Sequence, residues 1–202
     1  MKKKILIGLL LCILFISIVL VIIFRATATP TSEEIINELK EITCYKTNVE
    51  YISKNTRGEE SEETVQYYSV DKGARIDFGQ DRVKFYRDGK ITVKDNISNK
   101  EFNVEDEFDV VHSLAFMKNL LSYPIIEGSI KEGQEEWGEK MFIELEVELF
   151  LKNDYLDKAK VFIDKKEKTP IGVIVYDKDG NIKLRIIYKN FEKLKEIDND
   201  LL

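Results

Sequence analysis

The fold is decided by the stretch MFIELEVELF, residues 141–150. Apolar side chains stand at every second position of this stretch, and Glu144, Glu146 and Glu148 lie between them. A period of two predicts a β-strand with one dry face and one acidic face. Catalytic carboxylate pairs normally sit in an apolar or crowded environment that shifts one pKa. The three glutamates therefore favour a solvated sheet face over a glycosidase-type pair.

The same alternation occurs on both sides of this strand. Short alternating segments precede it at residues 45–51, 65–69, 75–78, 83–86, 91–93 and 101–104, and follow it at 160–164, 171–176 and 182–191. The polar tract 55–63 is expected to be a loop, and Asp88-Gly89 is typical of a tight hairpin. The sequence thus predicts about ten antiparallel strands, with about six before the second helix and about four after it.

Two helices are expected among the strands. Thr31 to Glu34 form a capping box, and the apolar residues that follow have helical spacing over about ten positions. The second helix is predicted from Glu107 to Ser122, because the residue before Pro124 disfavours a helical backbone. The charged tail from Glu192 onward is expected to fray.

Three residues are candidates for binding a partner. Phe116 and Leu120 fall on the polar side of the predicted second helix. Either both faces of that helix are covered, or one face awaits a partner. Trp137 lies in a polar, glycine-containing stretch, where it is either a plug at a barrel end or an exposed anchor for a partner.

The composition argues against an enzyme and against a metal site. The 202-residue chain is 44% hydrophobic, which allows a full core, but a single histidine and two cysteines leave no Cys/His zinc motif. His112 has no nucleophile beside it in a recognisable motif, so helix packing or a surface position is favoured over a role as a lone base. Asp177-x-Asp179-Gly180 is compatible with a calcium-binding loop or a hairpin turn. A calcium loop needs a glutamate six residues after its glycine, and that position is Ile186, so the hairpin turn is favoured. We therefore expect no catalytic residue, no cofactor and no metal.

The charge distribution argues against nucleic-acid binding. Residues 1–28 contain four basic residues and no acid, so the rest of the chain carries ten more acidic than basic groups. Such a surface repels phosphate backbones and anionic headgroups.

The N-terminus predicts export. Residues 5–24 are apolar apart from Ser17, which is long enough for one membrane-spanning helix. The preceding lysines keep the N-terminus cytoplasmic, so residues 29–202 are expected to form an exported domain behind a membrane anchor or signal sequence at residues 1–28. Cleavage after Ala28 is the competing interpretation. Lipidation of Cys12 is disfavoured by Leu11, and Cys44 is either a buried small hydrophobe or a free thiol.

This order of elements resembles the LolA/LolB-like lipoprotein-carrier fold, an unclosed barrel whose concave side is capped by helices. The segments TPIGVIVYDKDGN, residues 169–181, and IYKNF, residues 187–191, resemble the end of such domains, while Leu39, Ile42, Tyr45, Val49 and Tyr51 resemble their opening helix and first strand. The implied fold class is α+β: an N-terminal membrane helix, then a LolA-like unclosed antiparallel β-barrel of about ten strands capped by two helices.

Within this group the stretch LLSYPIIEG, residues 120–128, resembles the GerS family of germination lipoproteins of spore-forming clostridia. That resemblance implies a membrane-anchored binding and regulatory protein of sporulation and spore germination. It also implies a location outside the cytoplasm or in the spore intermembrane space. The implied partner is an exported, cortex-modifying N-acetylmuramoyl-L-alanine amidase, which the protein would bind and activate. The alternative is a lipid or lipoprotein carrier that uses the concave apolar face.

Overall fold

The computed structural model describes residues 13–20, 29–56, 58–134, 137–151 and 155–202. The chain divides into two units, Met1–Thr31 and Ser32–Leu202. Residues 13–20 of the first unit are helical. Among the described residues, no helix is long and apolar enough to span a membrane. Most of the predicted span at residues 5–24, and Cys12 with it, lies outside the described residues, so the anchor stays a prediction.

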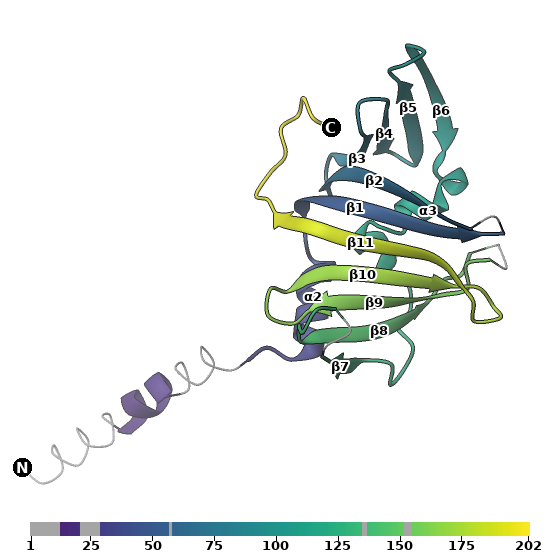
Figure 1. Cartoon of the computed structure of the whole chain (residues 1–202). Coiled ribbons are helices and arrows are strands. Elements are labelled where there is room, and N and C mark those ends of the chain that lie inside the picture. Colours follow the sequence, from purple (N-terminus) through teal and green to yellow (C-terminus); the bar gives the residue numbers. More distant parts are fainter. Residues whose placement is uncertain (1–12, 21–28, 57, 135–136, 152–154) are drawn as a thin grey trace, which may run out of the picture. The chain divides into compact units, whose positions relative to one another are not determined.

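The second unit is built on one antiparallel sheet of eleven strands in the order β6-β5-β4-β3-β2-β1-β11-β10-β9-β8-β7 (Figure 1). The strands are β1 (Cys44–Asn55), β2 (Gly58–Ser69), β3 (Gly73–Phe78), β4 (Arg82–Arg87), β5 (Lys90–Asp95), β6 (Lys100–Glu105), β7 (Lys131–Gly133), β8 (Phe142–Glu148), β9 (Lys158–Asp164), β10 (Thr169–Tyr176) and β11 (Ile182–Lys193). The first and last strands pair in the middle, and β6 and β7 are the two free edges. The sheet is therefore unclosed, as the resemblance implied.

The strands differ from the sequence prediction at two places. The tract 55–63 is not a loop, because β1 and β2 pair without interruption from Cys44↔Ser69 to Asn55↔Gly58. The polar residues of this extension are exposed and form cross-strand contacts with β11, including an ion pair between Glu59 and Arg185 at 3.2 Å. The short strand β7, which has no alternation to reveal it, raises the total to eleven.

The first predicted helix is confirmed as α2 (Ser32–Lys40), which buries Ile35, Ile36 and Leu39. The second is wrong as a single helix: the chain instead forms η1 (Asp106–Phe108), α3 (Val110–Ser113) and α4 (Met117–Leu120). The break lies at Phe116, whose backbone is extended, with φ −76° and ψ 116°.

The core lies between the sheet and these helices. Directly opposite residues in an antiparallel ladder share a face. The register therefore places Leu145, Val161, Val173, Ile186 and Tyr51 in one row. All five belong to the larger hydrophobic cluster, together with side chains of α2 and α4. We call this helix-covered side the inner face and the opposite side the outer face.

The C-terminal tail is attached rather than frayed. β11 continues to Lys193, and Ile197 is only 3% exposed. The side chain of Lys72 donates a hydrogen bond to the carbonyl of Ile197 at 2.7 Å, and Arg75 donates one to the carbonyl of Leu201 at 3.1 Å. One apolar side chain and two cationic donors thus hold the tail that its charged sequence predicted to be loose.

Candidate functional site

A polar cluster occupies part of the inner face around α3. Lys84 of β4 and Asp109 form an ion pair, and Tyr86 of β4 donates a hydrogen bond to Asp109 at 2.7 Å. The Nδ1 atom of His112 lies 2.5 Å from the other carboxylate oxygen of Asp109. Burial opposes ionisation of Asp109, but the contacts with His112, Lys84 and Tyr86 outweigh it and hold the pKa of this carboxyl well below its usual range. Asp109 is therefore a fixed negative charge that ties α3 to the sheet.

His112 is packed, as the sequence indicated. Its ring makes edge contacts with Tyr51 and Phe78, with centroids 4.9 Å and 5.0 Å away. Its Nε2 atom lies 3.2 Å from Glu62, while Nδ1 faces Asp109. Both ring nitrogens are thus engaged by carboxylates, an arrangement that fixes the histidine rather than presenting it as a base.

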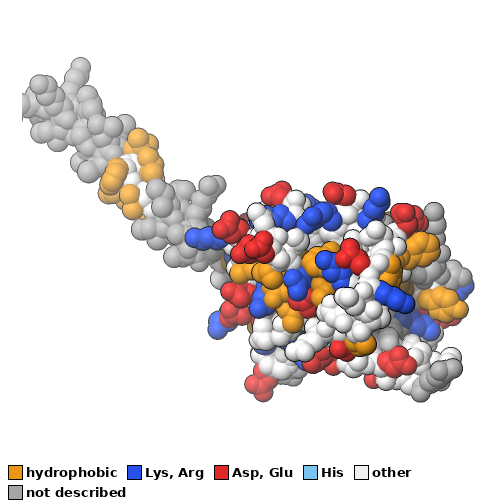
Figure 2. All heavy atoms as spheres, turned by 90° about the horizontal axis from the view of Figure 1, so that it is seen from above, with side chains coloured by type: hydrophobic (Ala, Val, Ile, Leu, Met, Phe, Trp, Pro, Cys, Tyr) orange, Lys and Arg blue, Asp and Glu red, His pale blue; other side chains and the backbone are white. Residues whose placement is uncertain are grey.

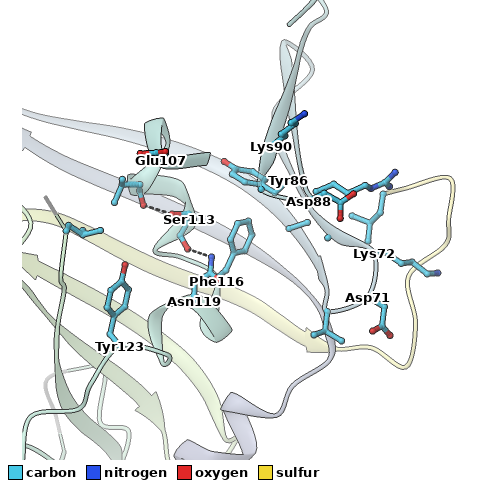
Figure 3. Close-up of a pocket in the computed structure, with 18 of the residues that line it drawn as sticks. Asp71, Lys72, Tyr86, Asp88, Lys90, Glu107, Ser113, Phe116, Asn119 and Tyr123 are labelled. Carbon is cyan, nitrogen blue, oxygen red and sulfur yellow. Dashed lines mark hydrogen bonds between the residues drawn. The ribbon is translucent and has the colours of Figure 1, made fainter. Parts of the chain in front are cut away.

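Beside this cluster lies an open cavity of about 900 Å³, walled by the ends of β3 and β4, the segments around α3 and α4, and the C-terminal tail (Figure 3). Tyr86 belongs to both the cluster and the cavity wall. The charged residues that line the cavity are of both signs: Asp71, Lys72, Arg87, Asp88, Lys90 and Glu107. Ser113 and Asn119 add polar groups, and Phe116 and Tyr123 add aromatic ones. Such a lining suits a polar or peptide-like occupant better than an acyl chain.

Phe116 and Leu120 are buried, at 2% and 0% exposure. Phe116 contacts Tyr68 and Tyr86 through its ring in the smaller hydrophobic cluster, whereas Leu120 belongs to the larger one. Of the two interpretations of these residues, the structure therefore shows the covered helix. Leu120 has no exposed surface and Phe116 reaches solvent only at the cavity wall, so neither is used in the candidate surface developed below, and their contact with a partner stays a prediction.

Trp137 lies over the outer face, where it is half-buried. Its ring packs against Phe162 of β9 with a centroid separation of 5.1 Å. A Cβ atom added to Gly172 of β10 would come within 2.7 Å of the indole. Gly172 thus makes room for the tryptophan, which is packed against the sheet rather than free. Whether its remaining surface contacts a partner stays a prediction.

A single lysine partly neutralises the acidic side of β8. Lys160 of β9 contacts Glu144 at 2.8 Å and Glu146 at 3.5 Å across the outer face. The hydrogen bond to Glu144 raises the pKa of Lys160, because it stabilises the charged form. Elsewhere on the molecule, the space-filling view from above shows acidic and basic side chains interspersed, with hydrophobic patches between them (Figure 2). The acidic face expected for β8 is present and is paired in part with a lysine of β9.

The remaining sequence candidates are structural. Asp177 closes the turn between β10 and β11 by accepting hydrogen bonds from the backbone of Asp179 at 3.0 Å and of Asn181 at 2.8 Å. Cys44 is buried, and burial raises the pKa of its thiol. No group of three or more His, Cys, Asp or Glu side chains that could hold a metal occurs in the described parts of the chain.

Comparisons with known proteins agree with this architecture. A family model described as sporulation protein YdcC-like matches residues 2–202. An uncharacterised conserved protein from Thermus thermophilus is similar in structure, with a TM-score of 0.56, 11% identity, and coverage of 85% of this chain and 93% of the other. A putative outer membrane lipoprotein-sorting protein domain from Vibrio parahaemolyticus gives a TM-score of 0.50 at 12% identity, covering 83% and 94%. At these identities the likeness shows the fold alone.

A chain from the structure of the Clostridioides difficile CwlD amidase in complex with the GerS lipoprotein also matches, at 16% identity over 85% of this chain and 98% of that one. Its TM-score is 0.41. No curated protein matches the sequence.

Proposed function

The chain belongs to the family of YdcC-like sporulation proteins, and from that premise we propose that it is a non-catalytic binding and regulatory protein whose partner is an exported cell-wall amidase. The proposal includes attachment to the membrane through residues 5–24 and display of the folded unit outside the cytoplasm. It also includes activation of the amidase, as the likeness of residues 120–128 to the GerS family implies.

One observation carries the choice of a protein partner over a lipid cargo: the apolar part of the inner face is already filled by the chain itself. Ile35, Ile36 and Leu39 of α2 and Leu120 of α4 pack in the same cluster as the inward-facing strand residues. An acyl chain needs a continuous apolar cavity, because each buried methylene contributes about 0.8 kcal/mol to its binding. The cavity of about 900 Å³ has a mixed lining, in which six charged side chains interrupt the apolar ones.

The polar cluster around Asp109 supports a non-catalytic role for this chain. Asp109 contacts both Lys84 and His112, and no activated nucleophile lies between them. The groups of this site hold α3 in place, and we expect chemistry on the cell wall to belong to the amidase.

The test is to measure binding of the full chain, purified in detergent, to the amidase of the same organism, and to measure hydrolysis of cell-wall substrate by the amidase with and without the chain. We expect a stable complex and faster hydrolysis. Retention of a fluorescent fatty acid by the chain, without binding or stimulation of the amidase, would replace this function with the carrier alternative.

A further inference from the structure

The two free edges of the sheet differ in a way that concerns partner binding. Exposed edge strands present unpaired backbone groups, and natural proteins protect them by keeping them short or by adding proline, bulges or inward charges. β7 is only three residues long. β6 is six residues long, pairs with β5 without a register shift and contains no proline (Figure 1). β6 is thus the edge with room for another strand.

The side chains of β6 alternate between two chemistries. The register Gln66↔Ile76↔Lys84↔Val93↔Phe102 runs across the sheet, so Phe102 lies on the inner face, and Val104 shares that face. Glu101 and Glu105 consequently point to the outer face. Phe102 is 52% exposed although its neighbour Val93 is buried. The apolar inner row therefore continues to the edge and stops there without a cover.

We propose that β6 is a docking edge for an extended strand of a protein partner whose side chains alternate between apolar and basic. The apolar residues of that strand would extend the inner row past Phe102. The basic residues would face Glu105 and Glu101, whose exposed carboxylate also lies 3.5 Å from Lys94. Backbone pairing supplies the contact, and the alternation supplies the specificity. This inference rests on the proposed function in one respect: the proposed function is what identifies the partner as the amidase.

Charge argues against a second copy of this chain as the occupant. Residues 100–107, KEFNVEDE, contain four acids and one lysine. In the antiparallel register that aligns residues 101–105 with the same residues of another copy, Glu101 would stand opposite Glu105, which destabilises a cross-strand pair. A basic strand has the opposite sign and is attracted to the same edge.

The direct test uses the full chain in detergent and a synthetic peptide of about nine residues with alternating valine and lysine. A peptide of the same charge with a central proline controls for simple charge attraction, because proline cannot join the ladder. We expect the first peptide to bind about tenfold more tightly than the second and to slow amide hydrogen exchange in residues 100–105. Equal binding of both peptides would overturn the proposal. So would slower amide exchange in β6 that appears without peptide and increases with protein concentration, because it would mean that β6 pairs with a second copy of the chain.

Variants of the chain test the same edge. Phe102→Ser and the double variant Glu101→Lys, Glu105→Lys should each weaken binding of the valine–lysine peptide by about tenfold. Phe150→Ser is the matched control, because Phe150 is also an exposed phenylalanine, at 70%, but lies after β8. It should bind as the wild type does, and an equal loss in all three variants would contradict the assignment to β6.

The amidase separates this inference from the proposed function. If the amidase binds wild type and Phe102→Ser equally well, the docking edge is wrong and the proposed function stands. If the amidase does not bind but the peptide protects β6, the docking edge stands and the partner is a different protein.

Discussion

At the scale of single residues, Asp109 joins three side chains on the inner face. Its carboxylate contacts an ammonium, a phenol and an imidazole that come from β4 and α3. The side chains of Lys84 and Asp109 are only 14% and 12% exposed, so solvent screens this pair weakly. The Lys84 ammonium and the Asp109 carboxylate therefore each need the other to offset the cost of burying a charge.

Asp109→Asn should therefore lower the free energy of unfolding by about 3 kcal/mol, because it leaves the Lys84 ammonium half-compensated in a buried site. The pKa of Asp109 is depressed in the folded state, so its contribution is present above the unfolded pKa of about 4 and is lost as pH falls below it. Denaturant titrations at several pH values should thus show wild type and variant converging in strong acid. Glu101→Gln, which removes an exposed pair with Lys94, should change stability by less than about 0.5 kcal/mol.

Trp137→Ala should destabilise the protein by about 2 kcal/mol, because the indole packs on Phe162 and over Gly172. The loss should be smaller than for a fully buried aromatic, since Trp137 is only half-buried. Thermal unfolding would measure it, with the exposed Phe150→Ala as the control. An unchanged melting temperature would mean that the packing of Trp137 does not stabilise the fold, and would favour its interpretation as an exposed anchor for a partner.

At the scale of elements, the break at Phe116 explains why the sequence misplaced the second helix. A continuous helix would put Phe116 and Leu120 on one side, whereas the extended residue between α3 and α4 sends them into different hydrophobic clusters. Apolar spacing favoured a continuous helix, but burial of two large apolar side chains outweighs the few hydrogen bonds lost at the break.

The strand β8 gives a sharper test of which side faces the core. Leu145→Asp should prevent folding, because an unpaired charge in a fully buried position costs several kcal/mol of a total stability of about 5–15 kcal/mol. Glu146→Lys, one residue on, should cost no more than about 1 kcal/mol through repulsion from Lys160 on the outer face. Circular dichroism and thermal melts of the two variants would compare them, and similar losses in both would mean that the facing of β8 is wrong.

What the sequence predicts well is what local periodicity controls. The alternation in residues 141–150 and the apolar spacing of residues 35–42 identified β8 and α2. The pairing of Lys84 with Asp109 could not be predicted, because it depends on α3 folding back over a strand distant in sequence. The only local signal was the i, i+3 spacing of Asp109 and His112. The strand β7 and the attachment of the tail could not be predicted for the same reason, since each depends on contacts with residues elsewhere in the sequence.

At the scale of the whole molecule, the tail completes one wall of the cavity, because Asn199 and Leu202 line it. Ile197→Asp should release this segment, lower stability by about 2–3 kcal/mol and increase amide exchange over residues 195–202. Asn199→Asp adds the same charge at an exposed position and should leave both measurements near wild type. Slow exchange in the Ile197 variant would show that the two cationic donors hold the tail alone.

The central pairing of β1 with β11 governs when this molecule can fold. Tyr45 pairs with Lys193, so the join between the two halves of the sheet needs nearly the entire polypeptide. Each half is a meander of neighbouring strands that can form early. Pairing β1 with β11 closes a long loop, because these strands are far apart in the sequence, and this step is entropically costly and slow. Assembly therefore waits for the last strand to be synthesised. Until then the edge of β1 that pairs with β11 and the inner apolar surface stay accessible, which exposes the unfinished chain to aggregation.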